Sequence, residues 1–171
     1  MKNGKLIALS AITTALGLVF LAIGAYIETL DLSCLFMASL VLTLPLAKNS
    51  VKGALLTYLA TAILSLVIGA GRFSVSLTYA LFFGIHPILN YLQTRGGKKR
   101  FYIYFIKLVL FLISAYLMVY MLNMFVFENE FIIKYLPIIV FVGGTLLFIV
   151  YDFCMVRFQK YTNIIVNRLG L

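Results

Sequence analysis

The sequence predicts an all-α integral membrane protein, a bundle of six transmembrane helices with both termini in the cytoplasm. Of the 171 residues, 64% are hydrophobic and 11% are charged, whereas a soluble domain is about half apolar and about a quarter charged. The apolar runs reach roughly 20 residues, the length that a helix needs to cross about 30 Å of hydrocarbon. Because lipid offers no partner for an unpaired backbone amide, and because these runs do not alternate as barrel strands do, we expect helices.

Short polar breaks divide the chain into six spans that form one transmembrane domain over residues 1–171. The second span is short and carries Pro45 near its end, and Pro87 inside the fourth removes a backbone donor and should kink that helix. Residues 157–171 make a basic cytoplasmic tail, for which an amphipathic helix on the membrane surface is one expectation. The helices are expected over about residues 6–27, 32–47, 53–70, 74–93, 101–126 and 135–156.

The distribution of lysine and arginine tests this topology. With the N-terminus inside, the outer segments hold only Arg72 and Lys134, and Lys107 lies within the fifth span. The excess on one side follows the rule that cytoplasmic loops carry the positive charge, so the spans alternate as a six-helix topology requires. The inner segments hold the other eleven basic residues: Lys2, Lys5, Lys48, Lys52, Arg95, Lys98, Lys99, Arg100, Arg157, Lys160 and Arg168.

Charge and motifs exclude several classes of function. The formal net charge is +9, but loops that lie beside anionic lipid account for it, and we expect no nucleic-acid partner. The chain has one histidine and two cysteines, with no metal-ligand spacing and no phosphate-binding glycine loop. We therefore predict no enzyme activity, no metal and no cofactor, and a location in the cell membrane.

Small residues mark one face of the first span. Ala11 and Ala15 lie four residues apart in the segment Ala-Ile-Thr-Thr-Ala, and Ala8 extends the same face. Side chains this small allow another helix to approach closely, either within the protein or from a partner. The second span opens on Asp31-Leu32-Ser33.

The six short spans, the Ala-x-x-x-Ala motif and the Asp31-Leu32-Ser33 opening together resemble the substrate-binding S components of energy-coupling factor (ECF) transporters. In that family the alanine motif faces the coupling helices of a transmembrane partner, which is carried by two cytoplasmic ATPases. The resemblance implies an S-component-like fold, a small-molecule substrate, and Ala11 and Ala15 as the face that docks on the coupling protein.

A polar set near the outer surface is a candidate substrate site. Tyr116, Tyr120 and Asn123 share one face of the fifth span, because they are spaced i, i+4 and i+7. The alternative is that the charges are solvated loop residues and the tyrosines form the aromatic belt at the interface. The full candidate set is Glu28, Asp31, Arg72, Tyr79, Tyr116, Tyr120 and Asn123.

A second polar set lies in the inner half. His86 and Asn90 are one turn apart in the fourth span, and Lys107 and Asp152 have similar depths in the fifth and sixth. An uncompensated charge at that depth is costly, so Lys107 and Asp152 are expected to pair if their helices are neighbours. One interpretation is a structural Lys107–Asp152 ion pair beside a hydrogen-bonded histidine. The other is a relay that carries protons or ions through His86. Lys107 could alternatively extend its ammonium group to the cytoplasm.

Three functional hypotheses follow. The first is the substrate-binding subunit of an ECF-type importer, which captures a small solute from outside and depends on partner ATPases for energy. The second is a membrane scaffold or assembly subunit without a ligand of its own. The third is a proton-coupled carrier of small solutes that uses His86, Lys107 and Asp152.

Overall fold

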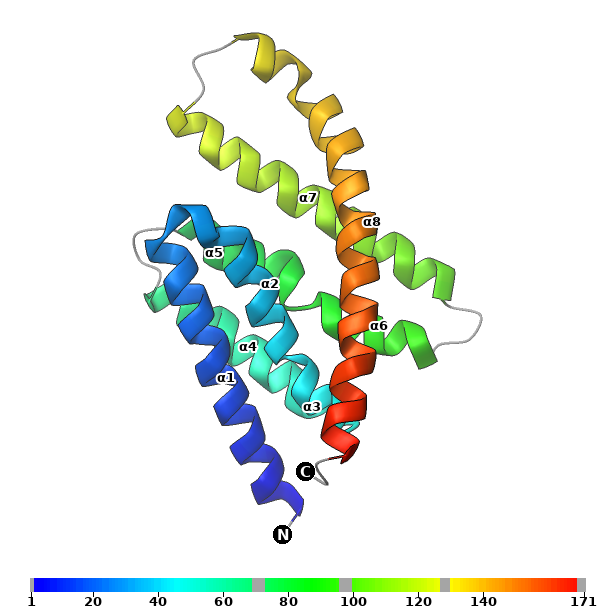
Figure 1. The fold of residues 1–171 in the computed structure, drawn as a ribbon. Helices are drawn as coiled ribbons and strands as arrows, with labels where there is room; N and C mark the ends of the chain where they lie inside the picture. The colour runs from blue at the N-terminus through cyan, green and yellow to red at the C-terminus, as the bar shows by residue number, and fades with distance from the viewer. Residues whose placement is uncertain (1, 69–72, 96–99, 127–129, 169–171) are drawn as a thin grey trace.

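The computed structural model describes residues 2–68, 73–95, 100–126 and 130–168, and this part of the chain is helical with no strand (Figure 1). The α-helices are α1 (Lys2–Tyr26), α2 (Asp31–Val41), α3 (Thr43–Ala47), α4 (Val51–Ile68), α5 (Phe73–Thr78), α6 (His86–Arg95), α7 (Arg100–Val126) and α8 (Glu130–Arg168). A 3-10 turn, η1 (Glu28–Leu30), precedes α2, and a π-helical segment, η2 (Tyr79–Phe83), follows α5.

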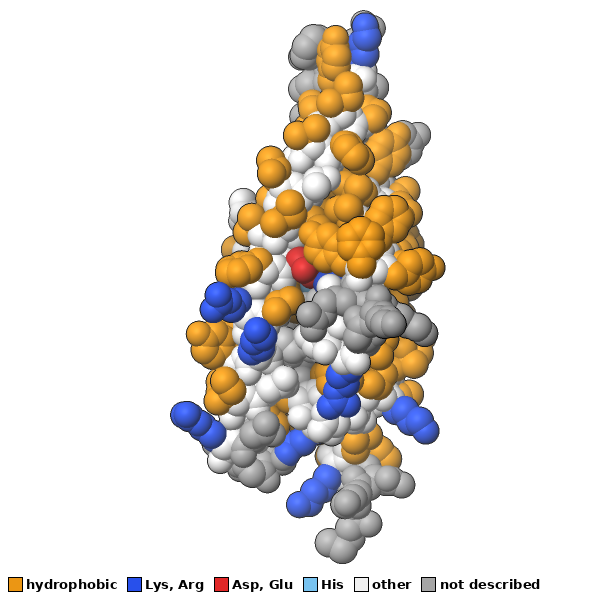
Figure 2. All heavy atoms as spheres, turned by 90° about the vertical axis from the view of Figure 1, so that its right-hand side faces the viewer, with side chains coloured by type: hydrophobic (Ala, Val, Ile, Leu, Met, Phe, Trp, Pro, Cys, Tyr) orange, Lys and Arg blue, Asp and Glu red, His pale blue; other side chains and the backbone are white. Residues whose placement is uncertain are grey.

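Five helical segments of the described chain are long and apolar enough to cross a membrane, and a shorter apolar segment, Asp31–Ala47, lies among them. The fold is therefore that of a helical multi-pass membrane protein. Both termini lie at the same end of the molecule (Figure 1). Lysine and arginine side chains lie mostly toward that end on the face that Figure 2 shows, and hydrophobic side chains cover the opposite half. The five long segments are Gly4–Tyr26, Val51–Ile68, Phe73–Arg95, Phe101–Val119 and Pro137–Val166.

The expected span over 32–47 is not one helix. It divides into α2 and α3 at Leu42, because Pro45 has no N–H to donate to the carbonyl of Val41. In the first turn of α3 that missing donor costs nothing, since the first N–H groups of a helix have no partner within it. The Thr43 hydroxyl donates to the carbonyl of Leu40 across the break (2.6 Å).

The expected span over 74–93 is also interrupted, at the proline that predicted a kink. After α5 the backbone widens into the π-helical η2, where the Gly84 N–H donates to the carbonyl of Tyr79 (2.8 Å). The chain then turns, and α6 begins at His86 with Pro87 in its first turn. This is the position in a helix at which proline is tolerated, and the expected kink is a two-residue turn between η2 and α6.

Gly84 is required by the packing at this break. A Cβ there would lie 2.5 Å from Cδ2 of Tyr58 and 2.9 Å from Cε1 of Tyr79. Neither ring moves easily, because the Tyr58 hydroxyl donates to the carbonyl of Ala80 (2.7 Å) and Tyr79 is buried.

We expect Gly84→Ala to lower the free energy of unfolding by about 1–3 kcal/mol, the usual effect of overpacking a core. The measurement is the melting temperature of the purified protein in detergent. Gly143→Ala is the matched control, because a Cβ at that helical glycine meets no atom within 4 Å. Equal melting temperatures for the two variants would contradict the packing argument.

The C-terminal segment continues the last helix beyond the end expected for the sixth span. Residues 130–168 form one continuous helix, α8, and its last third packs against the rest of the protein. The hydroxyls of Thr43 and Thr162 lie 3.2 Å apart, and Gln159 and Val166 are buried. One face of this stretch therefore packs inside the protein, while Phe158, Tyr161 and Ile165 are exposed on the other.

Small side chains allow α1 to lie close to α2 and α4. A Cβ on Gly24 would meet the Cβ of Cys34 at 3.0 Å, and one on Gly17 would meet Thr61 at 3.3 Å. In a bilayer, helix association depends on such close packing and on hydrogen bonds between helices. The hydroxyls of Thr13 and Thr57, 3.2 Å apart, supply one of these bonds between α1 and α4.

Candidate functional site: a buried charged cluster between α6, α7 and α8

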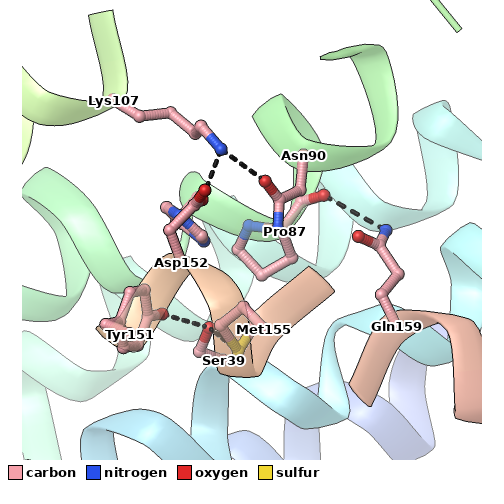
Figure 3. A network of polar contacts seen from close by, with 9 residues as sticks. Ser39, Pro87, Asn90, Lys107, Tyr151, Asp152, Met155 and Gln159 are labelled. Atoms are coloured by element: carbon pink, nitrogen blue, oxygen red, sulfur yellow. Dashed lines mark hydrogen bonds and ion pairs between the residues drawn. The ribbon is translucent and has the colours of Figure 1, made fainter. Parts of the chain in front are cut away.

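The four inner-half residues come together in one cluster, in which Figure 3 shows Asn90, Lys107 and Asp152. His86 and Asn90 come from α6, Lys107 from α7 and Asp152 from α8. Oδ1 of Asp152 pairs with Nζ of Lys107 and lies 3.0 Å from Nε2 of His86. The same ammonium group donates to Oδ1 of Asn90. The predicted pairing of Lys107 with Asp152 is confirmed, and the Lys107 side chain is buried inside the protein.

The cluster is almost completely removed from solvent and lipid. His86, Asn90 and Lys107 are buried, and the Asp152 side chain is 13% exposed. A charge inside a membrane protein is costly unless it is paired. Here one carboxylate accepts from a cation and from the imidazole, so the positive charge of Lys107 is balanced at short range.

The local sequence explains how α6 contributes two members. The break at Gly84 and Pro87 starts a new helix at His86, and Asn90 lies one turn later on the same face. The carbonyl of Pro87, in the first turn of α6, accepts from Nε2 of Gln159, 3.4 Å away on α8 (Figure 3). The start of α6 therefore positions both the histidine and a contact between α6 and α8.

Aromatic rings surround the histidine. The centroid of the His86 ring lies 4.7 Å from that of Tyr151, 5.0 Å from Phe82 and 6.4 Å from Phe148. The Tyr151 hydroxyl is itself hydrogen-bonded to Ser39 Oγ (3.0 Å; Figure 3). An apolar shell lowers the local dielectric constant and strengthens the ion pair that it encloses.

Two polar atoms of the cluster have no hydrogen-bond partner among the described residues, namely Nδ1 of His86 and Nδ2 of Asn90. Because the Asp152 carboxylate accepts only, neutral His86 carries its proton on Nε2 and presents the lone pair of Nδ1 to the aromatic shell. The arrangement can hold charge and hold helices together, and it offers one buried proton acceptor.

The outer-half candidates lie in different surroundings. Tyr79 is 1% exposed inside the core and Asp31 is buried at the start of α2. Tyr116 is 42% exposed and lines an apolar cavity between α7 and α8. The structure therefore does not bring these three side chains into one pocket.

The structure describes the remaining outer candidates only in part. Arg72 lies outside the described residues. The backbone of Glu28 belongs to η1 and those of Tyr120 and Asn123 belong to α7, but the three side chains lie outside the described part of the structure.

The docking candidates lie on the outward face of α1. Ala11 and Ala15 are exposed, and their neighbours Ile12 and Leu16 are 59% and 43% exposed. The opposite face of α1 carries the contacts to α2 and α4 described above. Within this chain, no described helix covers the alanine motif.

Several residues of the cluster's surroundings were not predicted from the sequence. Tyr151 and Gln159 bond to Ser39 and Pro87, which are distant in the sequence. The one available signal was that Gln159 is a polar residue within a continuing helical pattern. In the described part of the chain, no three His, Cys, Asp or Glu side chains are grouped to hold a metal ion.

Comparison of the chain with protein-family models, with curated proteins and with solved structures finds no match. The fold and the cluster define a class, a helical multi-pass membrane protein in which an ion pair joins α7 to α8 and hydrogen bonds to it join α6.

Proposed function

We propose that the chain is the substrate-binding subunit of an ECF-type importer in the cell membrane, with both termini in the cytoplasm. It captures a small solute at the outer face and depends on a transmembrane coupling protein and ATPase subunits for energy. The observation that carries the proposal is the outward position of Ala11 and Ala15 on α1, where a partner helix can approach closely.

The shape of the bundle supports this reading. Both termini lie at one end of the molecule (Figure 1), which agrees with an even number of crossings. The basic side chains gather mostly toward the same end (Figure 2), as positive cytoplasmic loops would. An S-component-like fold with the alanine motif near its cytoplasmic end has this polarity.

In this proposal the charged cluster has a structural role. It joins α6, α7 and α8, so that these helices keep their positions while the partner acts on α1. The buried Nδ1 of His86 favours a second candidate function, a proton-coupled carrier in which the imidazole takes up a proton.

We expect Ala11→Trp and Ala15→Trp to abolish co-purification of the chain with a coupling protein and its paired ATPases. A large indole on this face holds the partner helix away. The measurement is the amount of ATPase recovered with the tagged chain. The chain contains no tryptophan, so the new indole also reports by its fluorescence whether the site is covered.

Ile63→Trp is the matched control, because Ile63 is 62% exposed on α4 and lies outside the alanine motif. Recovery of the ATPases with the Ala11 and Ala15 variants at the level of this control would overturn the docking claim and favour the scaffold. Solute uptake that persists without ATP but fails in His86→Ala would favour the carrier.

A further inference from the structure

A cavity of about 310 Å³ lies between the α3–α4 turn, the end of α6 and the last third of α8. It is separate from the charged cluster and from the alanine motif. Its walls carry two cations, Arg95 from α6 and Lys160 from α8, together with the amide side chains of Asn49, Gln159 and Asn163.

Among the residues that the structure describes, no acidic side chain lines the cavity beside these two cations. Asp152, which shares α8 with Lys160, is paired with Lys107. Two like charges facing one hollow repel each other and favour an anion between them.

The arginine is held in place before any ligand arrives. Asn49 has a left-handed backbone (φ 57°), which asparagine adopts more readily than most residues. Its Oδ1 accepts from the Tyr91 hydroxyl (3.1 Å) and from the Arg95 guanidinium. The guanidinium also lies over the Tyr91 ring, 4.5 Å from its centroid.

The fixed guanidinium keeps further N–H donors for a ligand. A guanidinium has five of them in one plane and matches the oxygens of a phosphate group, while the lysine ammonium adds a point charge. The buried Gln159 amide, anchored on the carbonyl of Pro87, closes the inner wall. The cavity thus combines charge, oriented donors and limited volume.

We propose that this cavity binds a phosphate-bearing anion. The chemistry is shared by two sources, the headgroup of an anionic phospholipid and a free phosphate from the aqueous phase. The site goes beyond the proposed import function and does not depend on it.

The test measures the melting temperature of the full chain in detergent as ligand is added. Inorganic phosphate represents the free anion, phosphatidylglycerol in mixed micelles the lipid, and phosphatidylcholine a lipid without net charge. We expect a saturable rise with phosphate or with phosphatidylglycerol, and none with phosphatidylcholine. The probe that saturates identifies the source.

Arg95→Gln and Lys160→Gln should each weaken that binding at least about tenfold, the effect of losing one charge-assisted hydrogen bond. Asn163→Asp should also weaken anion binding, because it places a carboxylate on the cavity wall without changing the contacts that hold Arg95. Arg157→Gln is the control, since Arg157 is exposed on α8, lies over the Phe153 ring and does not line the cavity.

The proposal is overturned if the unmodified chain shows no saturable response to either anionic probe. It is also overturned if the Arg95, Lys160 and Asn163 variants respond as Arg157→Gln does. Binding to the cavity together with intact ATPase recovery in the Ala11 and Ala15 variants would sustain this site while rejecting the proposed import function.

Discussion

Lys107→Met is expected to lower the free energy of unfolding by about 3 kcal/mol, in the range for breaking a buried ion pair or placing an unpaired carboxylate in a bilayer. The variant leaves Asp152 with His86 as its remaining described partner and removes the donor to Oδ1 of Asn90. The shell around the cluster is aromatic, so little water reaches the uncompensated charge.

A double variant separates the contribution of the ion pair to stability from the contributions of its two residues. Lys107→Met with Asp152→Asn removes both charges, while the new amide oxygen can still accept from Nε2 of His86. We expect the double variant to be more stable than Lys107→Met alone, because the cost lies in the unpaired carboxylate and not in the loss of the pair itself. The coupling free energy is calculated from the unmodified chain, the two single variants and the double variant, and it measures the interaction between Lys107 and Asp152.

The measurement is the free energy of unfolding in mixed micelles of increasing denaturing detergent. Lys52→Met is the control, because Lys52 is exposed near the start of α4 and its loss should change stability by less than about 0.5 kcal/mol. If Lys107→Met matched this control, the cluster would not hold the helices together, and the structural role proposed for it would be wrong.

Phe82→Ala is expected to be the second large effect. Phe82 is fully buried, and its ring centroid lies 4.9 Å from Phe111, 5.3 Å from Tyr151 and 6.3 Å from Phe148. The residue therefore joins η2 to both α7 and α8, and it also covers the His86 ring at 5.0 Å.

We expect Phe82→Ala to cost about 2–3 kcal/mol. The same truncation in a soluble core costs about 3–5 kcal/mol, but part of that is transfer from water, and the unfolded reference in lipid is already apolar. The rest of the cost is the loss of packing contacts around the space that the smaller side chain leaves empty.

Melting temperature in detergent measures this loss, with Phe105→Ala as the control. Phe105 lies on α7 and is 55% exposed, so its ring has few protein contacts to lose. A Phe82 variant as stable as the Phe105 variant would show that the aromatic shell does not organise this part of the bundle.

Lys107→Met and Phe82→Ala both change the region where η2 and α6 meet α7 and α8. The ion pair gives α6, α7 and α8 a fixed polar contact, and Phe82 packs against the same helices from η2. Because His86 contacts both Asp152 and Phe82, variants at the two sites should not be additive. Residues that share a partner usually show coupling free energies of about 0.5–3 kcal/mol.

The sequence by itself determined the class of protein and most of its spans. Apolar runs of this length can be satisfied only by helices in lipid, and the structure has long apolar helices at five of the expected positions. It also marked the break at Pro87, since a proline in a helix removes a donor wherever the helix lies. The pairing of Lys107 with Asp152 could be predicted because a membrane penalises an unpaired charge.

Only the tertiary structure decided which side chains meet. The packing of residues 157–168, the end of α8, against α3 depends on contacts such as Thr43 with Thr162. The same holds for the separation of Tyr79 from Tyr116 and for the cavity that places Arg95 beside Lys160. Hydropathy fixes how deep a residue lies, whereas the rotation of each helix and the choice of its neighbours come from packing between helices, which no local pattern encodes.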